Sequence, residues 1–166
     1  MKGDLNFVHG QGFTDTTSQS CGVRYPALMF QPRVLSILTI LGILLESGSY
    51  FLVLAAILCW NVILPRFNPF DAIYYHLVAK RTGQPRVGPA PAPRRFAQGM
   101  AGTFMLAIGL SLNSGRDSLA WTFEVLLLIA LGALVLGRFC FGSWVYHLLT
   151  RNLALARRTL PWTRAE

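Results

Sequence analysis

Two histidines at matching places in a repeated pattern are the first candidates for chemistry. His76 and His147 each lie between a tyrosine and a leucine. A matched pair of this kind invites a haem or chlorophyll ligand hypothesis, because imidazole nitrogens bind porphyrin metals. His76, however, lies on the polar face of its predicted helix, whereas such a ligand must point into an apolar cleft. We therefore expect both histidines to anchor the chain at a membrane surface.

Glu124 is an ionisable residue inside an apolar stretch, about one and a half helical turns from its end. Such a group is costly in a membrane and usually faces a partner or a cavity. Three interpretations are open: a structural hydrogen bond from Arg116 or a threonine such as Thr122, a proton or ion pathway, and a contact to another subunit. The structural hydrogen bond is our expectation, and Glu46, at a turn, is expected to be solvated.

The three cysteines, Cys21, Cys59 and Cys140, are too few and too scattered for a disulfide framework or a zinc site. We expect inert thiols. The sequence has no glycine-rich phosphate loop, catalytic triad spacing or paired carboxylate motif. We therefore assign no catalytic, cofactor-binding or metal-ligating residue, and expect neither an enzyme nor a bound cofactor.

The composition indicates where these residues are placed. Of 166 residues, 53% are hydrophobic and only 13% are charged, against about 25% charged in soluble domains. Fifteen basic and seven acidic residues give a net charge of +8, which in a soluble protein would indicate a nucleic-acid partner. In a membrane protein, basic residues instead orient the spans and contact anionic lipid heads. We therefore expect a lipid bilayer, and no nucleic acid, as partner.

The first apolar stretch runs from Val34 to Leu64 and is interrupted at Glu46. As one helix, its 31 residues would be about 46 Å long, well beyond the ~30 Å hydrocarbon core. As a hairpin, its two helices are short for membrane spans. The second half of the chain has apolar stretches at 96–112 and 119–137, and the small residues of the former favour close helix packing.

A surface helix is predicted after each pair of stretches. Asn68 can cap a helix, Pro69 suits its first position and Asp71 favours its positive end. Apolar residues then recur with helical spacing up to Val78, which predicts an amphipathic helix that ends by Gly83. The proline-rich residues 82–93 are predicted to form an extended, polyproline-type segment, which we call the strap.

An internal repeat favours the hairpin. Each half has a Pro-Arg pair, an apolar region, an Arg-Phe pair and then a Tyr-His-Leu sequence. With two hairpins the chain has four spans. Twelve basic residues between Arg33 and Arg164 then share one face with both termini, which the positive-inside rule places in the cytoplasm. A three-span arrangement also satisfies this rule but does not explain the repeat.

Four motifs are similar to those of a known group of sequences. They are Asn68-Pro-Phe-Asp71, the proline strap, Pro93-Arg-Arg-Phe-Ala97 and Phe139-Cys-Phe-Gly-Ser-Trp-Val-Tyr146. From roughly Gln31 to Arg151, the chain resembles an uncharacterised family of small four-span bacterial inner-membrane proteins, a domain of unknown function. The resemblance implies a bacterial cytoplasmic membrane and four helices, without an established reaction. Many members have Cys-x-Gly-Cys where this chain has Cys140-Phe-Gly-Ser143, so dithiol chemistry lacks its resolving cysteine here.

The sequence therefore predicts an all-α integral membrane protein with four transmembrane helices. They form two tandem hairpins, each followed by an amphipathic interfacial helix. The segments are a polar cytoplasmic region (1–30), a first hairpin and interfacial helix (31–81), a strap (82–93), a second hairpin and interfacial helix (94–152) and a basic tail (153–166). The expected function is that of a non-catalytic accessory or structural subunit, or assembly factor, of a larger bacterial respiratory, photosynthetic or transport complex. The alternative is a thiol- or quinone-linked redox protein or a small transporter component, using Cys140, Glu124 or His147.

Overall fold

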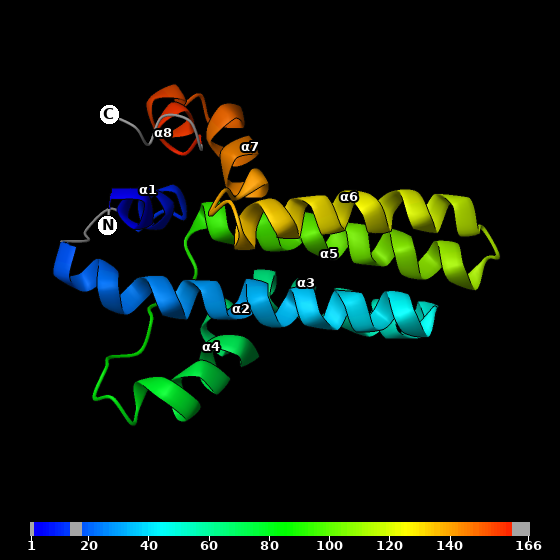
Figure 1. The fold of residues 1–166 in the computed structure, drawn as a ribbon, viewed down its shortest axis with the longest axis horizontal. Helices are drawn as coiled ribbons and strands as arrows, with labels where there is room; N and C mark the ends of the chain where they lie inside the picture. Colours follow the sequence, from blue (N-terminus) through cyan, green and yellow to red (C-terminus); the bar gives the residue numbers. More distant parts are fainter. Residues whose placement is uncertain (1, 14–17, 161–166) are drawn as a thin grey trace.

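The computed structural model describes residues 2–13 and 18–160, and every regular element in that part of the chain is a helix. The elements are α1 (Lys2–Gly10), α2 (Ser18–Leu45), α3 (Gly48–Ile63), the 3-10 helix η1 (Pro65–Phe67), α4 (Pro69–Tyr74), the π-helical turn η2 (Tyr75–Ala79), α5 (Ala92–Asn113), α6 (Asp117–Val135), α7 (Phe141–Leu149) and α8 (Leu153–Arg158). Figure 1 shows α2, α3, α5 and α6 lying side by side, with the short helices gathered at one end. The all-α fold predicted from the sequence is confirmed.

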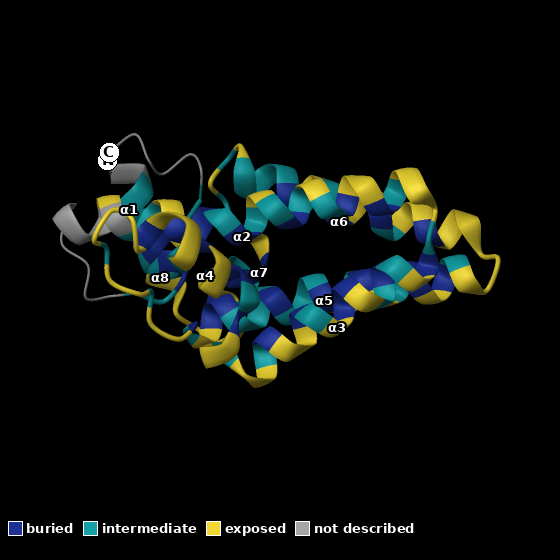
Figure 2. Ribbon diagram, turned by 90° about the horizontal axis from the view of Figure 1, so that it is seen from below, coloured by how far each residue is buried: buried dark blue, intermediate teal, exposed yellow. Residues whose placement is uncertain are grey.

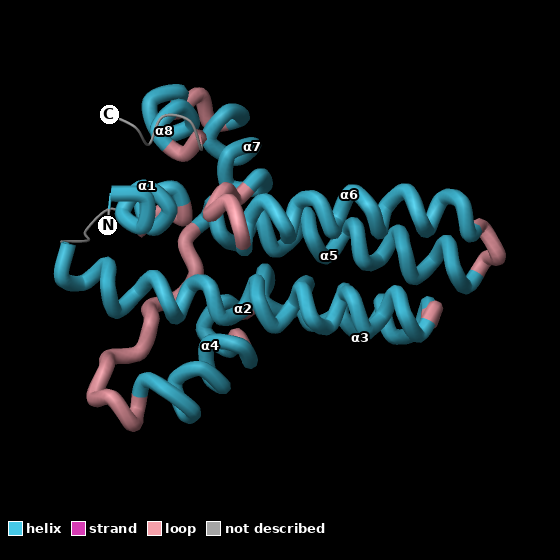
Figure 3. Tube along the Cα trace, viewed as in Figure 1, coloured by secondary structure: helices cyan, strands magenta, loops and turns pink. Residues whose placement is uncertain are grey.

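Tight turns join α2 to α3 and α5 to α6 at the end of the bundle opposite the short helices (Figure 3). Glu46 has a φ of 47°, and the Ser47 side chain caps α3 by accepting a hydrogen bond from the Tyr50 N–H at 3.4 Å. The apolar stretch at 34–64 is thus two helices, and the alternative of a single long helix is wrong.

The long helices pack mainly across the two halves of the chain. α3 packs along α5, α5 against α6 and α6 against α2, whereas α2 and α3 make few contacts. Figure 2 shows α2 and α6 in one layer and α3 and α5 in the other. A Cβ atom at Gly109 would lie 2.8 Å from the backbone oxygen of Gly48, and one at Gly102 would lie 3.3 Å from the Cβ of Leu58. The small residues of α5 therefore bring it close to α3 inside the protein.

The first thirty residues differ from the predicted polar surface layer. α1 lies within them, and α2 begins at Ser18 rather than near Val34. Pro26 and Pro32, which lack the backbone N–H of a helix interior, lie inside α2. Apolar burial offsets the hydrogen bonds lost at the prolines. Four buried apolar residues pack α1 against α2, namely Phe7, Val8, Leu28 and Met29.

A short helix follows each pair of long helices, as predicted. Asn68 Oδ1 accepts a hydrogen bond from the Phe70 N–H at 3.0 Å and Pro69 is the first residue of α4, as predicted. α5 begins at Ala92, inside the range expected for the strap. α8 occupies part of the predicted basic tail, whose residues Trp162 and Arg164 lie outside the described residues.

Two helical segments, Arg24–Leu45 and Asp117–Val135, are long and apolar enough to cross a membrane, with mean hydropathies of 1.9 and 2.1. α3 is apolar but has only 16 residues. Within the described chain, length and composition thus identify two of the four predicted spans.

Candidate functional site

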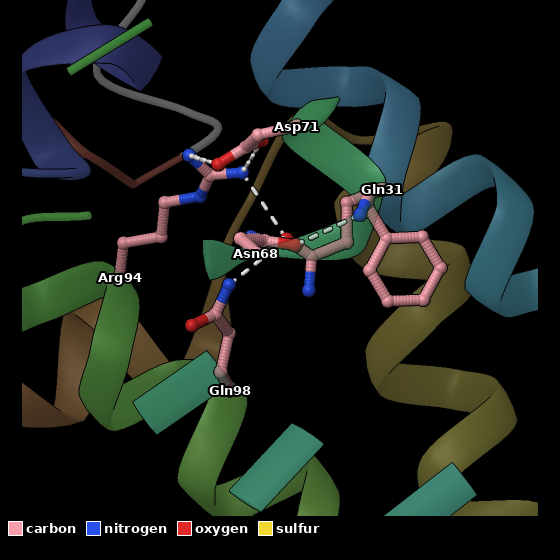
Figure 4. Close-up of polar contacts among 6 residues, drawn as sticks. Gln31, Asn68, Asp71, Arg94 and Gln98 are labelled. Atoms are coloured by element: carbon pink, nitrogen blue, oxygen red, sulfur yellow. Dashed lines mark hydrogen bonds and ion pairs between the residues drawn. The ribbon is translucent and has the colours of Figure 1, made fainter. Parts of the chain in front are cut away.

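A buried group of polar side chains lies where α2, α4 and α5 meet, and we call it the polar cluster. Its members are Gln31, Asn68, Asp71, Arg94 and Gln98. Figure 4 shows these side chains converging from helices of both halves of the chain. Four of the five residues are at most 7% exposed, so their polar atoms must find partners within the protein.

Arg94 and Asp71 form the charged part of the polar cluster. One guanidinium nitrogen of Arg94 lies 2.9 Å from Asp71 Oδ1 and the other lies 3.4 Å from Oδ2. Their side chains are 6% and 17% exposed, so the pair is shielded from most of the solvent. Asp71 was predicted to stabilise the start of its helix, and the structure adds a bidentate ion pair with the second half of the chain.

Gln31 contacts three other members of the polar cluster through one oxygen atom. Its Oε1 atom accepts hydrogen bonds from Asn68 Nδ2 at 3.2 Å, from an Arg94 guanidinium nitrogen at 3.1 Å and from Gln98 Nε2 at 2.8 Å. Since an ordinary carbonyl oxygen has two lone pairs, three donors on one oxygen satisfy it fully. Gln31 therefore joins α2 to the start of α4 and to α5.

A small cavity of about 70 Å³ adjoins the polar cluster. Mostly apolar side chains line it, together with Gln11, Gln31, Arg94, Gln98 and Cys140. Gln98 Oε1 is buried there without a hydrogen-bond partner among the described residues. The volume is enough for about two water molecules, each of which would need polar partners such as this oxygen.

Cys140 borders this cavity and immediately precedes α7. Burial raises the pKa of its thiol above the ordinary value of 9.0, although hydrogen bonds from the Ser143 and Gly142 backbone and from Gln11 act in the opposite direction. The thiol is therefore protonated at neutral pH, and thiolate chemistry is disfavoured. Ser143, at the place of the missing second cysteine, donates its hydroxyl hydrogen bond to the Gly10 backbone oxygen.

The two histidines do not form a pair. His76 is exposed on the π-helical turn, whereas His147 is buried at 4% exposure. His147 Nε2 lies 2.9 Å from the Gly10 backbone oxygen, to which it donates as the N–H tautomer. The expectation of a shared surface-anchoring role is wrong for His147, because α1, absent from the prediction, covers it. Its Nε2 atom is therefore engaged within the protein.

Glu124 lacks the hydrogen bond expected from its neighbours. Thr122 Oγ1 donates to the Ser118 backbone oxygen at 2.8 Å, and Arg116 is exposed at the turn without an ion pair among the described residues. Glu124 itself is 7% exposed. The predicted local satisfaction of this carboxylate is therefore wrong.

The sequence predicts roles for Asp71 and for the Pro-Arg pair at 93–94 but none for Gln31 or Gln98. A glutamine at the edge of an apolar stretch gives no signal by itself. One clue was that Gln31 directly precedes the Pro-Arg pair of the first half.

Residues 25–151 match the family described as Domain of unknown function (DUF4395). The chain belongs to this family. The match includes every residue of the polar cluster and the whole bundle from Tyr25 onwards. No curated protein and no solved structure matches the chain. The polar cluster links helices of both halves and leaves Gln98 Oε1 without a hydrogen-bond partner among the described residues.

Proposed function

We propose that the chain is a four-span protein of the bacterial cytoplasmic membrane, with both termini in the cytoplasm. In this proposal it is a non-catalytic accessory or structural subunit, or an assembly factor, of a larger membrane complex. The observation that carries the membrane placement is the exposed apolar surface of the bundle. Large apolar residues exposed by more than half lie on all four long helices, and include Ile37, Leu44, Val53, Ile63, Leu110, Trp121 and Ile129.

The distribution of charge supports the same placement. The turns at one end of the bundle carry Glu46, Arg116 and Asp117, while the end with the short helices carries most of the arginines and lysines. Basic residues remain on the cytoplasmic side of bacterial membrane proteins. A single helix of 16 residues, such as α3, is about 24 Å long and would require local thinning of the bilayer.

The polar cluster supports a structural rather than a catalytic role. Apart from Gln98 Oε1, its ion pair and amide groups contact one another, which supports a role in holding the two halves together. A groove of about 670 Å³ between α3 and α5 is largely apolar and borders Gly99. A helix of a neighbouring subunit would gain van der Waals contacts in such a groove, because lipid tails fill irregular surfaces poorly.

The topology has a direct test in reporter fusions. A periplasmic reporter fused after Gly48 should be active, and one fused after Arg158 should be inactive. The reverse pattern, or labelling of residue 20 from outside the cell, would reject the proposed orientation.

The subunit role has a separate test in co-purification from native membranes in mild detergent. The parent chain should bring a fixed set of membrane proteins with it. Gly99→Leu, which fills the groove, should lose them, whereas Gly132→Leu, at a position on α6 with nothing within 4 Å, should retain them. A parent protein that is monodisperse and alone would defeat the subunit proposal.

A further inference from the structure

Three acidic residues of this basic protein gather around one hollow at the turn end of the bundle. Asp4 pairs with Arg138 at 2.8 Å and Asp71 pairs with Arg94 at 2.9 Å. Of the acidic residues that the structure describes, the other three have no basic partner. They are Glu46, Asp117 and Glu124, and all three line the same hollow.

The hollow lies between the ends of α2, α5 and α6 and has a volume of about 420 Å³. Its remaining walls are aliphatic side chains together with Trp121, which is 66% exposed. The volume falls within the range of small-molecule sites, about 300 to 1,000 Å³. The walls combine negative charge, apolar surface and one aromatic ring.

Glu124 is the residue that points to a missing ligand. It is more than nine-tenths buried, lines the hollow, and receives no hydrogen bond or ion pair from any residue that the structure describes. Glu46 lines the same hollow. A carboxylate that has no partner among these mostly apolar walls is unfavourable, and a cation in the hollow would supply the missing contact.

The spacing of the carboxylates decides the kind of cation. Within the described chain, no three acidic, histidine or cysteine side chains come together closely enough to hold a metal ion. A larger cation with apolar substituents would instead reach the separate carboxylates and cover the aliphatic walls. An indole ring such as that of Trp121 also attracts organic ammonium groups through its face.

We propose that this hollow binds an organic ammonium cation with apolar substituents, held by Glu124 with Asp117, Glu46 and Trp121. The site is additional to the subunit role and does not depend on it. The ammonium group can belong to a free amine or to the headgroup of a zwitterionic lipid. Both can reach the hollow, since it is at the end of the bundle proposed to face the periplasm.

The test uses the purified full-length protein and radiolabelled benzyltrimethylammonium in nanodiscs of phosphatidylglycerol. We expect saturable binding that weakens about tenfold or more in Glu124→Gln and less in Trp121→Leu, because a buried charge contributes more than an exposed ring. Asp4→Asn, at the opposite end of the bundle, is the matched control and should bind as the parent does. Asp117→Asn, at an exposed position, provides a second weakened variant if Glu124→Gln fails to fold.

The neutral isostere neopentylbenzene separates charge recognition from simple apolar filling. It should compete poorly with the labelled cation. Including phosphatidylethanolamine in the nanodiscs should weaken probe binding if the lipid headgroup is the natural ligand and leave it unchanged if a free amine is. Absence of saturable binding, an affinity of the folded Glu124→Gln and Asp117→Asn variants equal to that of the parent protein, or competition by the isostere as strong as that by the unlabelled cation would overturn the proposal.

Discussion

Arg94 contacts both carboxylate oxygens of Asp71, at 3.4 and 2.9 Å, and so ties α5 to α4 across the repeat. The matching arginine of the first half, Arg33, is exposed and forms no ion pair with an acidic residue that the structure describes. The two Pro-Arg pairs of the repeat therefore have different tasks. One arginine fastens the fold, and the other faces the surroundings.

This difference gives the first prediction. Arg94→Gln should lower the free energy of unfolding by about 3 to 5 kcal/mol, because it leaves the mostly buried Asp71 carboxylate without its cation. Arg33→Gln should change it by less than about 0.5 kcal/mol, as is usual for exposed positions. Reversible unfolding in detergent micelles measures both values, and similar values for the two variants would contradict the assignment.

The second prediction concerns the attachment of α1. His147→Ala removes one of two donors to the buried Gly10 oxygen, which keeps its hydrogen bond from Ser143, so the free energy of opening α1 should fall by about 0.5 to 1.5 kcal/mol. Hydrogen exchange in residues 2–10 should become faster while exchange in α5 stays unchanged. The control is His76→Ala, since His76 is exposed. Unchanged exchange in α1 of the His147 variant would show that this contact does not hold the helix.

The third prediction follows from the raised pKa of Cys140. A variant with Cys21→Ser and Cys59→Ser should react slowly with N-ethylmaleimide at pH 7, because the thiol and not the thiolate is present. Its labelling rate should continue to rise with pH beyond the ordinary thiol value of 9.0 rather than level off there, because the thiolate fraction grows until the pH exceeds the raised pKa. The same variant unfolded in detergent should react faster at every pH below that range. Equal rates in the folded and unfolded states at pH 7 would contradict a buried, protonated thiol.

The stability of the protein should follow the same shift in pKa. Below pH 9 both states hold the Cys140 proton, so this group leaves the free energy of unfolding unchanged. At a higher pH the unfolded state releases the proton first, so stability falls as the pH rises. Cys140→Ser should remove this part of the pH dependence, as measured by unfolding between pH 8 and 10.5.

The fourth prediction concerns the close contact of α3 with α5. Gly102→Leu should destabilise the protein by about 1 to 3 kcal/mol, because the new side chain must displace Leu58. Gly132→Leu adds the same side chain where nothing lies within 4 Å and should be close to neutral. Gly102 is thus a probe of internal packing rather than of partner binding.

The sequence predicted those features that local residue chemistry decides. The start of α4 at Asn68 and Pro69 and the turn at Glu46 needed only capping and backbone preferences. The polar cluster could not be predicted, because Gln31 and Gln98 are 67 residues apart and meet only through helix packing. α2 was placed too late in the chain because Pro32 is a poor helix residue in isolation, and its tolerance depends on burial against α1.

The packing of α3 on α5 also affects how the helices assemble while the chain is being synthesised. When the ribosome has completed the first hairpin, the close-packing partner of α3 has not yet been made, and it is complete only at Asn113. In the proposed membrane placement, the side of α3 that packs on α5 faces lipid until then. We expect the first half alone to be degraded in cells, and co-expressed halves separated at Gly88 to reassemble and protect one another from proteolysis.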